Sequence, residues 1–226
     1  MTEFSPHVVL PLLLWGTLVG LDLVSVPQAM ISRPVVAGAV AGAIAGDLEA
    51  GFRIGVLFEL FALDVMPFGA VRYPDYGPAT IGAVALAAGT PWELGLGIGT
   101  AFGLILAVLG GWSLQVVRRW NARSIQRQAA ALAAGESSAI RRLQYGALFR
   151  DALRGFTLTL TALVLASTLS ESIRLDRQTA VAFTLVAIGS ALAAAVNSVV
   201  RASGRGPRLK WLVAGLAVGL LIAVLL

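Results

Sequence analysis

Two carboxylates lie within a stretch of otherwise apolar sequence. Glu59 follows Gly-Val-Leu-Phe and is separated from Asp64 by four apolar residues. If this stretch lies in a lipid bilayer, a charged side chain there costs about 2.5–3.5 kcal/mol on insertion scales, so Glu59 must face protein, a cavity or a partner. A carboxylate in such a place can accept charge-assisted hydrogen bonds from hydroxyl groups of a solute. The alternative is structural: either carboxylate pairs with Arg33, Arg53 or Arg72.

Other polar residues interrupt the apolar sequence of the same half. Asp22 ends an apolar run, and Gln28, whose amide both donates and accepts hydrogen bonds, follows Pro27. A binding role and a cap or loop role both fit these two residues. Asp47 is better explained as the N-cap of the helix that follows it, because aspartate is a preferred N-cap residue.

Residue types that support catalysis are scarce in this chain. There is no cysteine, which excludes a disulfide framework, a thiolate nucleophile and a zinc–thiolate site. His7 is the only histidine, and nothing around it provides the reactive, accessible setting that phosphotransfer requires. The sequence contains no Ser-His-Asp arrangement, glycine-rich phosphate loop or metal-ligand cluster. We therefore expect no catalysis by this chain alone, no metal site and no cofactor.

Composition identifies the environment of these residues as a membrane. The chain is 58% hydrophobic and 13% charged, whereas soluble domains carry about 25% charged residues. Leu94–Val117 and Thr179–Val200 contain no charge, and a helix needs roughly 20 apolar residues to cross the hydrocarbon core. Backbone groups in lipid must be satisfied internally, so such runs form helices. The sequence predicts an all-α integral membrane protein, a polytopic helical bundle.

The first 93 residues differ from ordinary membrane spans. Their apolar runs are short and are separated by prolines, which break helices. These runs are Val8–Leu21, Val35–Ala45, Ile54–Leu63 and Ala79–Gly89. Lengths near 10–14 residues are typical of interrupted or re-entrant helices, from which many secondary transporters build substrate sites. We therefore expect residues 1–93 to form a substrate-translocating module.

Residues 94–226 are predicted to form a membrane scaffold, in which spanning helices are joined by segments rich in arginine and lysine. Phe156–Ser170 and Trp211–Leu226 are further expected spans, and the basic segments are Arg118–Arg154 and Arg201–Lys210. Lysine and arginine are enriched in cytoplasmic loops, which places both basic segments in the cytoplasm. The same topology explains the basic residues without nucleic acid as a partner.

The segment 118–154 contains eight arginines and is expected to be helical. Gly135 can stop a first helix, and Ser137 or Ser138 can cap a second. The segment is either an interfacial helix on anionic lipid, or a docking face for a cytoplasmic partner or an arm between subdomains. Two small-residue series predict close helix packing, within the chain or between subunits. They are Gly38, Gly42 and Gly46, and Gly95, Gly99 and Gly103.

Several of these polar residues fall within an ordered set of motifs between residues 20 and 75. The motifs are Gly20-Leu-Asp22-Leu-Val-Ser-Val-Pro-Gln28-Ala-Met-Ile-Ser-Arg33-Pro34, Gly46-Asp47-Leu-Glu-Ala-Gly51, Gly55-Val-Leu-Phe-Glu59-Leu, Pro67-Phe-Gly69-Ala70 and Tyr73-Pro74-Asp75. In these motifs the chain resembles the membrane IIC subunit of the mannose–fructose–sorbose branch of the bacterial sugar phosphotransferase system. The remaining sequence matches only as hydrophobic spans.

The resemblance implies a sugar permease subunit of the bacterial inner membrane. Such a subunit pairs with a membrane subunit called IID in a higher-order complex, and the cytoplasmic IIB subunit phosphorylates the sugar as it arrives. The phosphohistidines belong to IIA and IIB, which agrees with the setting of His7. Two other functions stay open: a permease for another small polar solute, and a non-transporting membrane scaffold or sensor that retains the fold.

Polarity in an apolar context, position beside helix breaks and membership of the motifs together predict the substrate site. We expect it where the interrupted segments meet, lined by Asp22, Gln28, Glu59, Asp64 and Asp75. Glu59 is the leading residue, because only a polar cavity or a partner makes its burial tolerable.

Overall fold

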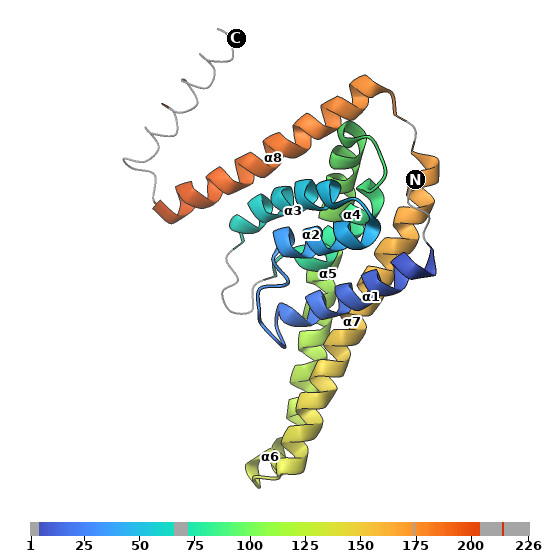
Figure 1. Cartoon of the computed structure of the whole chain (residues 1–226). Coiled ribbons are helices and arrows are strands. Elements are labelled where there is room, and N and C mark those ends of the chain that lie inside the picture. The colour runs from blue at the N-terminus through green and yellow to red at the C-terminus, as the bar shows by residue number, and fades with distance from the viewer. Residues whose placement is uncertain (1–4, 66–71, 174, 204–213, 215–226) are drawn as a thin grey trace.

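The computed structural model describes residues 5–65, 72–173, 175–203 and 214, and helices are the only regular secondary structure among them (Figure 1). The helices are α1 (Pro6–Asp22), α2 (Pro34–Ala45), α3 (Leu48–Leu63), α4 (Tyr76–Ala87), α5 (Trp92–Arg127), α6 (Ala129–Ala133), α7 (Ser137–Ser172) and α8 (Arg177–Ser203). The expected span Trp211–Leu226, apart from Ala214, and the expected basic loop from residue 204 onward lie outside the described residues. The motif at residues 67–70 lies outside them too.

The helices fall into two classes by length. Helices α5, α7 and α8 are long and apolar enough to cross a membrane, whereas α1, α2 and α4 are apolar but shorter. At 1.5 Å per residue, the 12 residues of α2 extend about 18 Å, against a hydrocarbon core of about 30 Å. The prediction of an all-α membrane bundle with interrupted helices in its N-terminal half is therefore confirmed.

Helices α2 and α3 form a tight hairpin. Gly46 ends α2 with a φ of 78°, a left-handed conformation that glycine adopts without strain. Asp47 accepts a hydrogen bond from the Ala50 N–H at 2.9 Å, which confirms the predicted N-cap. A Cβ on Gly42 would lie 2.7 Å from the Gly51 Cα, so the two helices touch through glycines of this chain. The expectation that Gly46 belongs to this packing face is wrong, because a Cβ there would meet nothing within 4 Å.

The core of the bundle is α4. Every residue of α4 from Gly77 to Ala87 is buried, because α1, α2, α3, α5 and α7 all pack against it. Phe58 of α3 lies at the centre, with its ring centroid 5.9 Å from that of Tyr76 at the start of α4. A Cβ on Gly103 of α5 would lie 2.5 Å from the Phe58 ring, so the second glycine series also packs within the chain.

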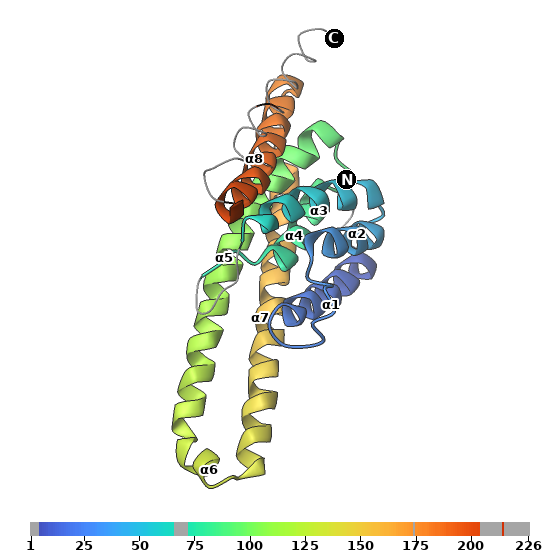
Figure 2. The ribbon, with the colours of Figure 1, turned by 90° about the vertical axis from the view of Figure 1, so that its left-hand side faces the viewer.

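Two further contacts complete the bundle. Helix α1 packs across α7 at an oblique angle, and α8 crosses α3 and α5 (Figures 1 and 2). Large apolar side chains of α8, among them Phe183, Leu185 and Val186, are exposed. An apolar surface of this kind in a membrane protein faces lipid or a partner subunit.

The basic segment forms a projecting helical hairpin. Helices α5 and α7 have 36 residues each, about 54 Å, and their distal halves extend beyond the other helices with α6 at the end (Figures 1 and 2). We name residues 118–150 the arm. Arg150 bridges its two helices by donating hydrogen bonds to the side chains of Asn121 and Ser124. The predicted helical character of this segment is thus confirmed.

Three helix boundaries near the arm differ from expectation. The first helix ends at Arg127, although Gly135, with a φ of 75°, does terminate the short α6 that follows. Ser137 is already the first residue of α7 and Glu136 occupies the N-cap position, so the predicted serine cap is wrong. The expected span from Phe156 has no separate start, because α7 continues unbroken through the basic segment.

Candidate functional site

The loop between α1 and α2 is held in place by Asp22. This carboxylate is buried and accepts hydrogen bonds from the N–H groups of Ala29 at 2.6 Å and Ser32 at 2.9 Å. Gln28 and Met30, which flank Ala29, have φ values of 57° and 62°, which few non-glycine residues adopt. Such conformations persist where surrounding contacts hold them. Of the two roles that the sequence allows for Asp22, binding or stabilising a loop, the observed hydrogen bonds fit the second. The same loop contains the exposed Gln28.

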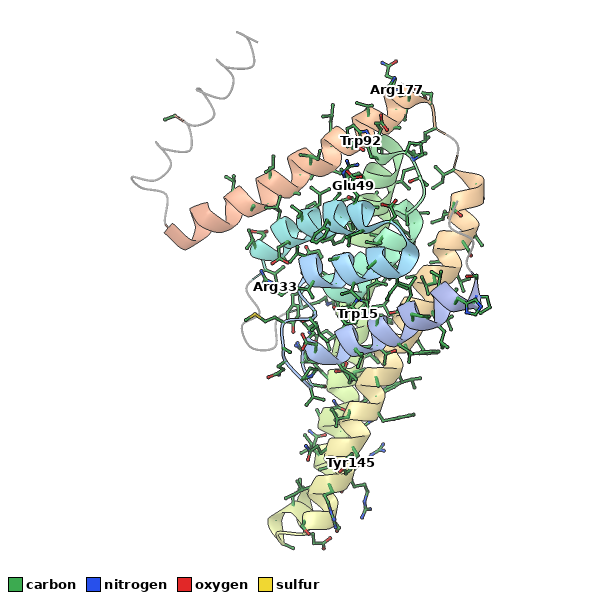
Figure 3. The ribbon with its side chains drawn as sticks, viewed as in Figure 1. Trp15, Arg33, Glu49, Trp92, Tyr145 and Arg177 are labelled. Atoms are coloured by element: carbon green, nitrogen blue, oxygen red, sulfur yellow. The ribbon has the colours of Figure 1, made fainter. Side chains whose placement is uncertain are left out.

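Glu59 lies at the open end of the α2–α3 hairpin. It forms an ion pair with Arg33, the residue just before α2, and its Oε2 accepts a hydrogen bond from the Val35 N–H at 3.3 Å. This pairing corresponds to the structural alternative for Glu59. However, the Arg33 side chain is 48% exposed and that of Glu59 is 20% exposed, so the pair is open to a solute. Figure 3 shows Arg33 at the side of the bundle where the α1–α2 loop lies.

Asp75 occupies a different environment, at the N-cap of α4. Its side chain is fully buried, and its Oδ2 lies 2.6 Å from Nη1 of Arg154. Nε of Arg154 contacts Oδ1 of Asp151 at 2.9 Å, and Nη2 donates a hydrogen bond to the Gly20 carbonyl at 3.1 Å. One guanidinium thus joins α1, α4 and α7 in the interior, where paired charges are retained and unpaired charges are costly.

The α1–α2 loop connects these two polar regions. The Ser25 hydroxyl donates a hydrogen bond to Oδ2 of Asp151 at 2.7 Å, which anchors the start of the loop to the buried cluster. The loop then passes the Asp22 clamp and ends at Arg33, which pairs with Glu59. The loop is therefore attached to the buried cluster at its start and to the exposed ion pair at its end.

Asp64 terminates α3 and is partly buried. Its Oδ1 accepts a hydrogen bond from Nδ2 of Asn197 at 3.2 Å. Asn197 belongs to α8, so this contact links the end of the short hairpin to a long helix.

The five predicted site residues therefore do not form one cluster. Asp22 and Gln28 belong to the α1–α2 segment, whose last residue, Arg33, pairs with Glu59, and Asp64 lies at the end of the same helix as Glu59. Asp75 is separated from them by its burial and its pairing with an arginine. The described contacts of Asp75 stabilise helix packing, and its part in substrate binding stays a prediction.

The partners of Asp75 do not follow from the sequence pattern. Arg154 ends the basic segment expected in the cytoplasm, yet it is 5% exposed and pairs with two carboxylates. The available signal was the spacing of Asp151 and Arg154, three residues apart on one helix face at the edge of an apolar run.

Within the described ranges no group of three or more histidine, cysteine, aspartate or glutamate side chains could hold a metal ion. In the buried cluster, the Arg154 guanidinium is the counter-charge of Asp75 and Asp151. The polar groups of the loop and the hairpin are hydrogen-bond donors and acceptors, which suits recognition of a hydroxylated solute.

Comparison with known proteins agrees with this geometry. A family model described as the sorbose-specific IIC component of the phosphotransferase system (PTS) matches residues 8–196. A solved structure described as a membrane protein has a TM-score of 0.70 at 21% identity, and the match covers 99% of this chain and 96% of that one. A chain from the mannose transporter ManYZ in complex with microcin E492 has a TM-score of 0.59 at 20% identity, with 99% and 95% covered. No curated protein matches the sequence.

At these identities the two solved structures show a common fold. The family model, in contrast, covers most of the chain. This multi-pass helical membrane protein therefore belongs to the family of sorbose-specific IIC components of the PTS.

Proposed function

We propose that this chain is the sugar-translocating membrane subunit of a phosphotransferase complex. It forms the translocation path together with a IID membrane subunit. A cytoplasmic IIB subunit, itself phosphorylated by IIA, transfers a phosphoryl group to the sugar as it arrives. The complex lies in the bacterial inner membrane, and the arm with its arginines faces the cytoplasm.

The observation that carries this proposal is the α2–α3 hairpin. Its helices, of 12 and 16 residues, are too short to cross a bilayer individually, yet the hairpin holds a half-exposed ion pair at its open end. Interrupted helices with accessible polar groups are how secondary transporters bind substrate within the membrane. A scaffold protein has no need for an accessible charge pair in this position.

The proposed substrate contacts start from Glu59. Its carboxylate accepts hydrogen bonds from sugar hydroxyls, and the exposed amide of Gln28 donates and accepts at the adjacent loop. Asp64 contributes at the end of α3. Asp22 acts through the loop that it clamps, and Asp75 acts through the buried cluster to which that loop is tied by Ser25.

The partner proposal has support from the surface of the bundle. Helix α8 exposes Phe183, Leu185, Val186 and Leu192, which gives a membrane partner a broad apolar face. One solved structure with the same fold is named as the mannose transporter ManYZ in complex with microcin E492. A IID subunit against α8 would leave the arm free for the cytoplasmic subunits.

The substitution Glu59→Gln tests the proposal, because it keeps the shape of the side chain and removes its charge. Loss of a charged acceptor is expected to weaken sugar binding by roughly 1–3 kcal/mol, about 5- to 150-fold. Binding of radiolabelled mannose and sorbose is measured on membrane vesicles that contain the chain and its IID subunit. Coupled uptake is measured in cells.

Glu136→Gln is the matched control, since Glu136 is an exposed glutamate on the arm. It should leave binding and uptake unchanged. The proposal is wrong if the wild-type complex binds none of the tested monosaccharides. The assignment of Glu59 is wrong if Glu59→Gln binds normally while Glu59→Leu fails to assemble.

A further inference from the structure

A cleft lies at the other end of the α2–α3 hairpin, where its tip meets the turn that leads into α5. The cleft has a volume of about 260 Å³. Its polar lining consists of Asp47, Glu49, Arg53, Thr90 and Trp92. Figure 3 shows Glu49 and Trp92 close together at this end of the bundle, away from Arg33.

The walls of the cleft are held by interactions that exist without a ligand. Asp47 joins the tip of the α2–α3 hairpin to the turn before α5. Its Oδ1 caps α3, and its Oδ2 accepts a hydrogen bond from the Gly89 N–H at 3.1 Å. The Arg53 guanidinium carbon lies 5.5 Å from the centroid of the Trp92 ring, and the same guanidinium pairs with Glu49. Pre-formed walls lower the ordering cost of binding.

The chemistry of the lining selects a class of ligand. Trp92 is 52% exposed and offers an apolar ring face, while the carboxylates and the guanidinium supply acceptors and donors beside it. A monosaccharide in its ring form has a complementary apolar face and a rim of hydroxyl groups. Two carboxylates against one guanidinium make the cleft net negative, which disfavours a phosphate ester. The volume is slightly below the roughly 300–1,000 Å³ of sites for drug-sized ligands.

We propose that this cleft is a second monosaccharide site, specific for the unphosphorylated sugar. It rests on the proposed function in taking a sugar as the transported solute. Arg53 and Glu59 are six residues apart on α3, about 9 Å along the helix axis. The α2–α3 hairpin therefore carries two binding sites for a neutral sugar, one at its open end and one at its tip.

Substitutions in the lining test this second site. Arg53→Gln removes a charged donor and is expected to weaken mannose binding at the cleft roughly 10-fold or more in vesicles that contain the full complex. The number of mannose molecules bound per complex should therefore fall, while binding at the Glu59 site is retained. Trp92→Ala removes the ring face and should also weaken binding. Trp120→Ala is the matched control, because Trp120 is 51% exposed but lies on the arm. It should bind mannose like the wild type.

A second measurement does not depend on how well these variants fold. The natural chain has no cysteine, so a single introduced thiol reports one position. Ala50→Cys places a thiol in the cleft lining, and free mannose should slow its reaction with a maleimide. Mannose 6-phosphate should protect it less. Ser124→Cys on the arm should react at the same rate with and without sugar.

The outcomes separate this inference from the proposed function. If the wild-type complex binds mannose or sorbose, but Arg53→Gln and Trp92→Ala bind equally well and Ala50→Cys is not protected, the second site does not exist and the proposed function stands. Stronger protection by the phosphate ester than by the free sugar would also overturn it. If the wild type binds no monosaccharide, the proposed function fails first.

Discussion

Two ion-paired regions flank the α1–α2 loop, and they differ in burial. In the buried region, the Arg154 and Asp75 side chains are 3% and 0% exposed, and one guanidinium serves two carboxylates and a carbonyl. In the open region, Arg33 and Glu59 are 48% and 20% exposed and form a single pair. Both contain a carboxylate that interrupts an apolar sequence. Only the second leaves that carboxylate accessible, so an intramembrane charge marks a binding group only where a solute can reach it.

The motif at residues 20–34 contacts both the buried and the open region. Ser25, at the start of the α1–α2 loop, is tied to the buried region, and Arg33, at its end, belongs to the open region. A rigid attachment on one side and an accessible pair on the other suit a segment that holds Gln28 toward a ligand. Burial at one end thus supplies order that the proposed recognition at the other end requires.

The largest effect expected from this comparison is that of Arg154→Leu. It leaves the Asp75 and Asp151 carboxylates buried without a counter-charge, which costs about 3–5 kcal/mol in stability. Arg33→Leu is the matched control, because exposed pairs contribute only about 0–1 kcal/mol. Thermal unfolding of the detergent-purified proteins measures both. Equal losses in the two variants would remove the distinction between the regions.

An intermediate effect is expected for Asp22→Ala. The N–H groups of Ala29 and Ser32 lose a charged acceptor, a loss of about 1.5–3 kcal/mol, so the loop should open more often. Hydrogen exchange of peptides spanning residues 23–33 should accelerate, and mannose binding should weaken because Gln28 is no longer held. Asp22→Asn retains an acceptor oxygen and should behave more like the wild type. Unchanged exchange in Asp22→Ala would show that other contacts hold the loop.

The smallest effect concerns the exposed start of α8, outside both regions. The Thr179 hydroxyl and N–H donate hydrogen bonds to Asp176 and hold the pKa of this carboxyl below its ordinary value. A lowered pKa means that the carboxylate stabilises the helix start above the unfolded-state pKa and loses this effect as pH falls through the folded-state value. Hydrogen exchange at the first turn of α8, corrected for intrinsic rates, should therefore rise on acidification. Asp176→Ala should abolish this pH dependence and leave sugar binding intact.

Much of the architecture follows from the sequence alone. Charge-free runs such as Leu94–Val117 require helices, because lipid offers no partner for the backbone. Short runs between prolines predict interrupted helices, and Asp47 is predicted as the N-cap of α3. These features are local: each depends on residues within a few positions of one another.

Only the tertiary structure decided which polar residues share a region. Asp75 and Arg154 are 79 residues apart, and Glu59 and Arg33 are 26 apart, so no local pattern pairs them. The sequence places Arg154 with the other arginines of a basic segment, whereas helix packing buries it between two carboxylates. The tip cleft, too, depends on two turns that approach only when α2–α3 packs against α4 and α5. Charge and hydropathy are properties of residues, but burial and pairing are properties of the packed chain.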